Sequence, residues 1–165
     1  MDSLYEWIKF LHVVAAVTFM VTHGTSIAIS FKLKGEQNVI KINTMLDISG
    51  SMWITMMLSL LVAGIAGIVL GFLLSWWSQW WIWVSIVTLL VITIWMFTIG
   101  QGTYHQLRKA LGMPYMARGR DMPAEEPASE EESQAWIAKT RPGLMLLVGY
   151  GGFVVIIWLM MFKPF

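Results

Sequence analysis

The sequence contains no cysteine, and this absence excludes disulfides, thiolate metal sites and thiol catalysis. Charge is also scarce, because Asp, Glu, Lys and Arg make up only 13% of the 165 residues while hydrophobic residues make up 57%. A soluble domain of this length carries about twice that share of charge. The net charge of +1 gives no nucleic-acid signal. The sequence therefore predicts an integral membrane protein, with the lipid bilayer as a partner and no nucleic acid.

Long charge-free runs take up most of the chain. Four of them lack Asp, Glu, Lys and Arg, namely Phe10–Phe31, Ile48–Leu74, Trp76–Leu107 and Pro142–Phe162. A membrane-spanning helix needs roughly 20 apolar residues, and its backbone satisfies its own hydrogen bonds. The alternating pattern of a membrane barrel is not visible. We expect an all-α fold, a single four-helix transmembrane domain over 1–165 with a loop at about 110–141 between the third and fourth helices.

Lysine and arginine predict the orientation of these helices. Nine of the eleven lie in the first and third connections: Lys32, Lys34, Lys41, Arg108, Lys109, Arg118, Arg120, Lys139 and Arg141. Basic residues accumulate on the cytoplasmic side of membrane proteins. We therefore expect both connections to face the cytoplasm and both termini to lie outside, in a prokaryotic cytoplasmic membrane.

The third connection is the longest polar segment. Pro114, Pro123 and Pro127 disfavour a helix in its first half, so we expect 113–127 to be irregular or poorly ordered. Ser129 precedes three glutamates and an apolar run that includes Trp136, a pattern typical of a capped helix. We expect a short helix over 129–138 on the inner membrane surface.

The second connection is rich in tryptophan, with Trp76, Trp77, Trp80, Trp81 and Trp83 in close succession. Tryptophan rings prefer the membrane–water boundary, because the indole is apolar and its N–H seeks a partner. The pattern favours an aromatic belt at the outer face. The alternative interpretation is a stacking surface for a quinone or a pigment.

Three histidines are the main candidates for chemistry, because ionisable groups inside a membrane are costly and mark functional sites. His12 and His23 lie in the first helix, and His105 lies at the inner end of the third. At 100° per residue His12 and His23 project from one face, roughly 16 Å apart along the axis. They are too far apart to share one metal ion, but each can serve a separate level of one cavity.

The expected depth of each histidine in the membrane then predicts which ligands it can combine with. His23 and His105 fall at the inner level, where two helices can offer axial imidazoles to one haem iron. His12 lies near the outer boundary, where Met160 or Met161 of the fourth helix is at a suitable depth for a second ligand. The alternative for each histidine is a polar side chain hydrogen-bonded to a neighbouring helix. No pattern indicates a catalytic residue.

Copper is a further candidate, because the chain holds thirteen methionines as well as the histidines, and thioether and imidazole both bind copper. The methionine pairs Met56-Met57 and Met160-Met161 are the relevant pattern. Methionine is also an ordinary filler of apolar cores.

The first helix also carries a resemblance to a known group. Its run Trp7-Ile8-Lys9-Phe10-Leu11-His12-Val13-Val14-Ala15-Ala16, with Asp47 before the second helix and Trp95 and Gln101 late in the third, resembles the copper-resistance protein D-like and HemJ-like superfamily of small four-helix membrane proteins, in its uncharacterised branch. The resemblance implies a four-helix bundle in which His12 is a haem or metal ligand. It does not imply the HemJ-type oxidase activity, because the third helix has no matching lysine.

These patterns together predict a membrane-embedded b-type haem-binding protein of electron transfer, a subunit of a larger membrane assembly or a homo-oligomer rather than a self-contained enzyme. His12, His23 and His105 are the expected haem and iron ligands. The first alternative is a copper-handling membrane protein. The second is a cofactor-free accessory subunit that packs against a larger complex through its glycine and tryptophan faces.

Overall fold

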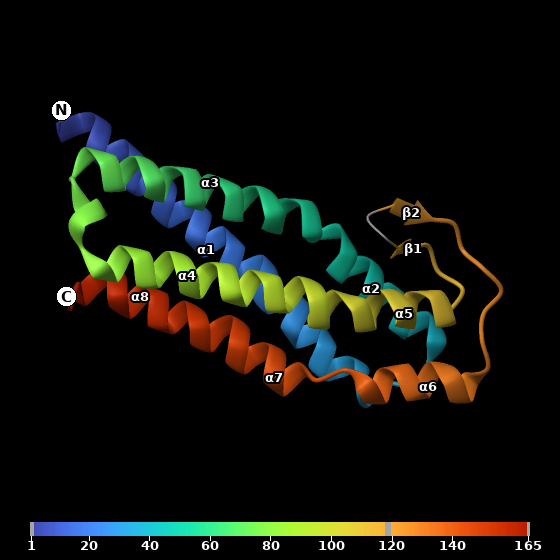
Figure 1. The fold of residues 1–165 in the computed structure, drawn as a ribbon. Coiled ribbons are helices and arrows are strands. Elements are labelled where there is room, and N and C mark those ends of the chain that lie inside the picture. Colours follow the sequence, from blue (N-terminus) through green and yellow to red (C-terminus); the bar gives the residue numbers. More distant parts are fainter. Residues whose placement is uncertain (1, 118–119, 165) are drawn as a thin grey trace.

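A computed structural model describes residues 2–117 and 120–164, and it confirms the all-α four-helix bundle (Figure 1). Within these described ranges, four helical segments are long and apolar enough to cross a membrane. In chain order they are α1 (Asp2–Leu33); α2 (Val39–Ser51) with α3 (Trp53–Leu73); α4 (Trp80–Trp95) with the π-helical η2 (Met96–Gly100) and α5 (Gln101–Ala110); and α7 (Pro142–Leu146) with the π-helical η3 (Leu147–Gly151) and α8 (Gly152–Phe162).

The connections add short elements to these helices. A 3₁₀ turn, η1 (Trp76–Ser78), joins the second and third spans. The third connection holds an antiparallel hairpin of β1 (Tyr115–Ala117) and β2 (Arg120–Met122), followed by α6 (Glu130–Lys139). The predicted short helix is confirmed, with the Ser129 hydroxyl accepting from the Glu132 N–H, while its place on the inner membrane surface stays a prediction. The prediction of an irregular 113–127 is wrong for the two strands, while Arg118 lies outside the described residues.

The second span begins earlier than its apolar run. We expected the helix to start near Ile48, but it starts at Val39, where the Asn38 side chain accepts from two backbone N–H groups. This N-cap starts a helical turn in polar sequence, where hydropathy gives no signal. The helix is interrupted at Met52, between α2 and α3.

The spans pack in two pairs, α1 along α3 and α4 along α8. Small residues let the first pair approach closely: Ala15 of α1 and Ala63 and Ala66 of α3 are all buried. In the second pair Gly152 lies against Ile92, and an added methyl group there would overlap the isoleucine side chain. Close backbone approach therefore holds both pairs together.

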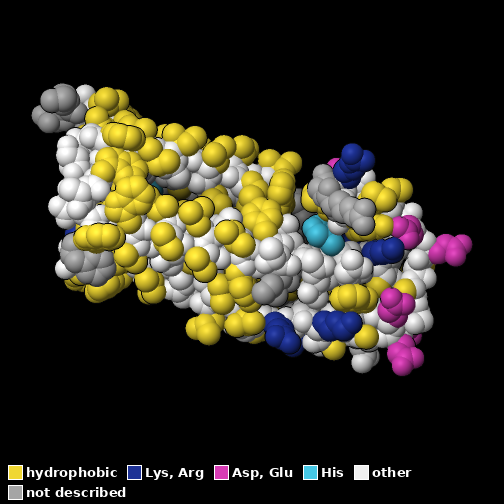
Figure 2. All heavy atoms as spheres, viewed as in Figure 1, with side chains coloured by type: hydrophobic (Ala, Val, Ile, Leu, Met, Phe, Trp, Pro, Cys, Tyr) yellow, Lys and Arg dark blue, Asp and Glu magenta, His cyan; other side chains and the backbone are white. Residues whose placement is uncertain are grey.

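The two ends of the bundle differ. The N- and C-termini and η1 lie at one end, which we call the terminal end, and the hairpin, α5 and α6 lie at the other, the loop end (Figure 1). Hydrophobic side chains cover the helices, and most charged side chains gather toward the loop end (Figure 2). This distribution agrees with a membrane protein. The side of the membrane that each end faces stays a prediction.

Two buried clusters mark these ends. At the terminal end Trp81, Ile82 and Leu159 are buried, with Trp76 and Trp77 packed against them. The expected tryptophan belt is therefore only partial: Trp80 is 72% exposed, but Trp81 is 2% exposed. The loop-end cluster consists of Leu33, Ile42, Leu46, Leu107, Leu111, Met113 and Ile137.

Candidate functional site

A cavity of about 660 Å³ lies between the two helix pairs, toward the loop end. Its walls come from every spanning segment and from the hairpin. This volume is typical of sites that bind small molecules and cofactors in proteins, which are concave and mostly apolar. The cavity is therefore the first candidate for a functional site.

Most of the cavity wall is apolar. Aromatic and aliphatic side chains from α1, α3, α4, η2 and α8 meet there: Phe19, Ile27, Leu60, Leu89, Ile92, Phe97 and Phe153. Thioethers add to this wall at Met56, Met57, Met96 and Met145. Methionine adapts its shape to an apolar ligand and contacts aromatic rings favourably. This part of the cavity suits a flat or flexible apolar body.

One polar wall faces this apolar surface, and α5 supplies it. Gln101, Tyr104, His105 and Arg108 all line the cavity. Their spacing of three, four and seven residues places them on one helical face. The sequence contains this signal as a polar stripe at the end of the third apolar run, but of these four residues only His105 was expected as a site residue from the sequence.

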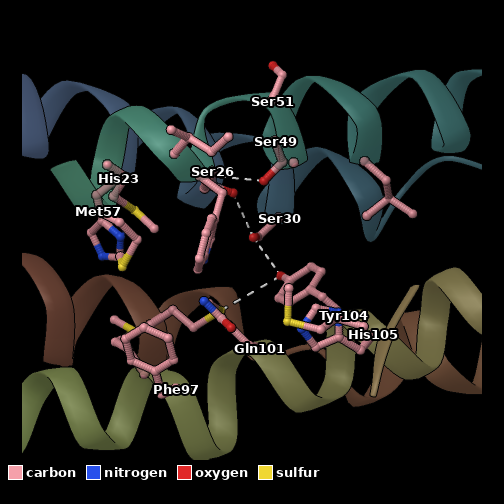
Figure 3. Close-up of a pocket in the computed structure, with 18 of the residues that line it drawn as sticks. His23, Ser26, Ser30, Ser49, Ser51, Met57, Phe97, Gln101, Tyr104 and His105 are labelled. Carbon is pink, nitrogen blue, oxygen red and sulfur yellow. Dashed lines mark hydrogen bonds between the residues drawn. The ribbon is translucent and has the colours of Figure 1, made fainter. Parts of the chain in front are cut away.

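Hydroxyl groups link the polar wall to α1 and α2 (Figure 3). The Tyr104 hydroxyl donates to Ser30 Oγ at 2.5 Å, and Ser30 donates to the Ser26 carbonyl at 2.8 Å. The Ser49 hydroxyl donates to Ser26 Oγ at 3.1 Å. A serine that bonds to the carbonyl four residues before it satisfies its own hydroxyl inside a membrane. This chain of bonds fixes the rotamers along one side of the cavity.

The charged groups around the cavity leave no free cation. Arg108 is the sole lysine or arginine that lines it within 2–117 and 120–164, and its Nη2 donates to Asp47 at 3.0 Å. The Nε of Arg108 donates to the Pro114 carbonyl at 2.7 Å. Asp121, on the hairpin, adds a second carboxylate to the lining. An anionic ligand would therefore find its one positive partner already engaged.

His23 lies at the bottom of the cavity, stacked between Phe19 and Tyr150 at centroid distances of 5.6 and 6.2 Å. Its Nε2 is buried and has no hydrogen-bond partner among the described residues. A methyl group added at Gly149 would lie 2.5 Å from this nitrogen and 2.7 Å from the Met96 methyl. The two π-helical segments therefore meet at this ring, and Nε2 faces the backbone of η3.

His105 also lines the cavity, but it does not meet His23. Figure 3 shows the two rings at opposite ends of the pocket, with Ser26, Ser30 and Tyr104 between them. The expected convergence of both imidazoles on one iron is not the arrangement in this structure. Depth along the helix axis placed both residues near the inner level, but the cavity separates the helix pairs at that level.

His12 lies outside the cavity, between α1 and α3. Its Nδ1 is 2.8 Å from the Ala63 carbonyl oxygen, and its ring packs at Gly67, where a methyl group would lie 3.1 Å from Cε1. A carbonyl only accepts, so Nδ1 carries the proton and Nε2 keeps its lone pair. The methionines expected as its partners, Met160 and Met161, are 37% and 74% exposed.

Ligation of haem or copper by these histidines stays a prediction. Across the described ranges no three His, Asp or Glu side chains come close enough to hold a metal ion together. The candidate ligand atoms are on single imidazoles: His12 Nε2, the buried His23 Nε2 and the His105 ring, which has no hydrogen-bond partner among the described residues. A haem iron needs only one or two such ligands.

Comparisons with known proteins assign the chain to no family, because no family model, no curated protein and no solved structure matches it. The resemblance to the copper-resistance protein D-like group stays a prediction.

Proposed function

We propose that the protein binds a neutral, largely apolar small molecule from the membrane in the cavity between its two helix pairs. The observation that supports this most is the division of the wall, apolar on four helices and polar on one face of α5. An unfilled cavity of about 660 Å³ would forfeit the packing of every side chain around it. A ligand with an apolar body and a small polar head restores those contacts.

The charged side chains of the cavity wall favour a ligand whose polar head group is uncharged. Arg108 is held by Asp47 and by a backbone carbonyl, and Asp121 stands on the exposed hairpin strand. A carboxylate or phosphate head would have to displace Asp47 from Arg108. Removing one partner of a charge pair leaves the other uncompensated, and this is unfavourable near a membrane interior.

A cavity-filling substitution tests the proposal. Leu60→Trp places an indole in the cavity, and Leu61→Trp places the same group one residue along, on a side chain that is 57% exposed on the lipid face. Organic extraction and mass spectrometry of purified protein should find a co-purified small molecule in the wild type and in Leu61→Trp, and not in Leu60→Trp. Equal recovery from both variants, or none from the wild type, would contradict the proposal.

A b-type haem is the second candidate, and one observation favours it. The bond from His12 Nδ1 to Ala63 orients the ring and leaves Nε2 as the free ligand atom, as backbone carbonyls do for metal-bound histidines. Haem would supply one-electron transfer, in a larger membrane assembly, with His12, His23 and His105 as candidate ligands. It ranks second because its two propionate groups need cations, and Arg108 in the cavity wall is engaged.

An absorption spectrum of the purified protein separates these candidates. A reduced-minus-oxidised haem band that is lost in His12→Ala or His23→Ala would support the haem function. Bound copper would favour the copper-handling alternative. A colourless protein that holds an extractable apolar molecule supports the first proposal, and one that holds nothing favours the accessory subunit.

A further inference from the structure

Two side chains on the polar wall of the cavity have no hydrogen-bond partner in the part of the chain that the structure describes. Tyr104 and Arg108 are both hydrogen-bonded. Gln101 and His105 line the same cavity, yet among residues 2–117 and 120–164 neither side chain has a hydrogen-bond partner. Both are partly buried. Polar groups in such places are usually paired, so two neighbouring exceptions point to an external partner.

The spacing of these two groups limits what they can bind. Gln101 and His105 are four residues apart on α5, which brings their Cβ atoms within about 5–6 Å. The amide NH₂ of Gln101 and one ring N–H of neutral His105 are donors. Figure 3 shows Gln101 near the middle of the pocket and His105 at one end. Two donors at this separation suit two acceptor oxygens on opposite sides of a single ring.

The neighbouring side chains indicate that the ring is flat and uncharged. Phe19, Phe97 and Phe153 offer aromatic faces, and Met57 and Met96 offer thioethers. Such side chains favour offset stacking and edge contacts with a planar ring. A cationic head would find Asp47 already bonded to Arg108, and the other carboxylate in the lining, Asp121, lies on the exposed hairpin rather than beside the apolar wall.

We infer that the cavity binds a quinone, whose two carbonyl oxygens accept hydrogen bonds from Gln101 and His105. The ring lies against the phenylalanines and methionines, and the apolar tail continues along the side of Leu60 and Leu89. This inference rests on the proposed function, because it names the ligand class of the same cavity. It concerns binding alone. The alternative interpretation of the sequence put a quinone among the tryptophans of the second connection, whereas these donors lie toward the opposite end of the bundle.

The test is a titration of quinone-free protein in nanodiscs with a short-chain ubiquinone analogue, its carbonyl carbons labelled with ¹³C. Binding is measured by calorimetry, and infrared difference spectra report the carbonyl stretch, which moves to lower frequency when the oxygen accepts a hydrogen bond. Gln101→Leu and His105→Phe should each weaken binding about 2- to 12-fold, the loss of one neutral hydrogen bond. Each should also return one carbonyl band to its unbonded frequency.

Matched controls separate this effect from damage to the helix. Gln106→Leu makes the same change on α5 at an exposed position that does not line the cavity, and it should leave affinity and spectrum unchanged. His105→Gln keeps a donor and should restore part of the loss. The same ring and tail without the carbonyls should bind more weakly than the quinone, and to the same extent in wild type, Gln101→Leu and His105→Phe.

Failure of the inference is distinct from failure of the proposed function. If the carbonyl-free analogue binds as tightly as the quinone, or if a quaternary-ammonium amphiphile binds more tightly, the quinone assignment is wrong while the cavity remains a ligand site. If Gln106→Leu weakens binding as much as Gln101→Leu, the assigned donors are wrong. If neither quinone nor analogue binds and nothing co-purifies, both proposals are wrong.

Discussion

At the terminal end the helices close on each other through tryptophan and glycine, whereas toward the loop end the same helices enclose a cavity. The closed end holds Trp81 and Leu159, each only 2% exposed, and Gly71 admits the Trp77 ring. The hollow part is walled by phenylalanine and methionine and by the polar face of α5. One set of spanning helices therefore supports two kinds of packing.

The hollow part is not a weakly packed end of the bundle. Beyond the cavity the loop-end cluster closes the structure, with Leu33 and Leu107 both 0% exposed. The hydroxyl chain through Tyr104 and Ser30 adds fixed contacts along one wall. A cavity framed on both sides by buried clusters is a specific feature of the fold, as sites for small molecules are.

The largest effect should come from filling the closed end. A methyl group at Gly71 would lie 3.1 Å from the Trp77 ring and 3.2 Å from Ile82, so Gly71→Ala overpacks a rigid contact. We expect the overpacking to lower the free energy of unfolding by about 1–3 kcal/mol relative to Gly64→Ala, in which the same gain in helix propensity meets no contact. Unfolding in detergent micelles, followed by circular dichroism against added sodium dodecyl sulfate, measures this difference.

The control for Gly71→Ala lies two turns earlier on α3. Among the described residues, no neighbouring side chain or other helix lies within 4 Å of a methyl group added at Gly64. Gly64→Ala should therefore be neutral or stabilise the helix by up to about 1 kcal/mol, through the lower backbone entropy of the unfolded chain. Equal destabilisation by the two substitutions would show that the terminal end is not the tightly packed region.

The next prediction compares the cation–π contacts of one lysine at the terminal end and one lysine at the loop end. Lys163 Nζ lies 4.0 Å from the Trp76 ring centroid and 5.7 Å from that of the buried Trp81, while Lys139 Nζ lies 4.0 Å from Trp136 alone. Such contacts contribute about 0.5–1 kcal/mol at exposed sites and more when desolvated. Lys163→Met should destabilise the protein more than Lys139→Met in the same detergent titration. The reverse order would show that the terminal tryptophans do not depend on this lysine.

The sequence alone predicted the helices well and the cavity poorly. Hydropathy is local, so four apolar runs are enough to predict four spanning helices and, with an even number of crossings, both termini at one end. Ser129 likewise predicted where α6 begins, because helix capping depends on a few adjacent residues. The early start at Asn38 is also a local signal, but it lies in polar sequence, where hydropathy gives no reason to expect a span.

The cavity depends on contacts between residues that are remote in sequence. Gly149 admits His23 from a helix more than a hundred residues earlier, and Gly152 admits Ile92. These contacts decide which helix faces meet and where a gap is left, and no periodicity records them. The histidines were found because they are rare in apolar runs. Gln101 and Tyr104 became site residues only once α5 was seen to face the cavity.

The smallest expected change in stability concerns the β1–β2 hairpin at the mouth of the cavity. A cluster of polar side chains joins this hairpin to α5. The Tyr115 hydroxyl donates to a Glu125 carboxylate oxygen, and Lys109 Nζ lies 3.3 Å from the other oxygen. The bond from Tyr115, followed by Lys109, lowers the pKa of Glu125, and the bond to Glu125 raises the pKa of Tyr115. Glu125 is exposed, and Tyr115 and Lys109 are only partly buried, so the contribution to global stability is small.

These directions fix the pH window in which the hairpin stays attached. A carboxylate with a depressed pKa contributes fully above its unfolded value, about 4.3, and its contribution is lost as the pH falls through the lower, folded value. A tyrosine with a raised pKa contributes below its unfolded value, about 10, and its contribution is lost as the pH rises through the higher, folded value.

Hydrogen exchange of the Tyr115 and Met122 amides should therefore show constant protection from about pH 5 to 9, after correction for intrinsic rates, and lower protection in more acidic solution. Glu125→Gln should reduce protection between about pH 5 and 9 and bring the Tyr115 titration back toward about 10, whereas Glu126→Gln, one residue away, should do neither. Unchanged protection in Glu125→Gln would mean that the strands alone hold the hairpin in place.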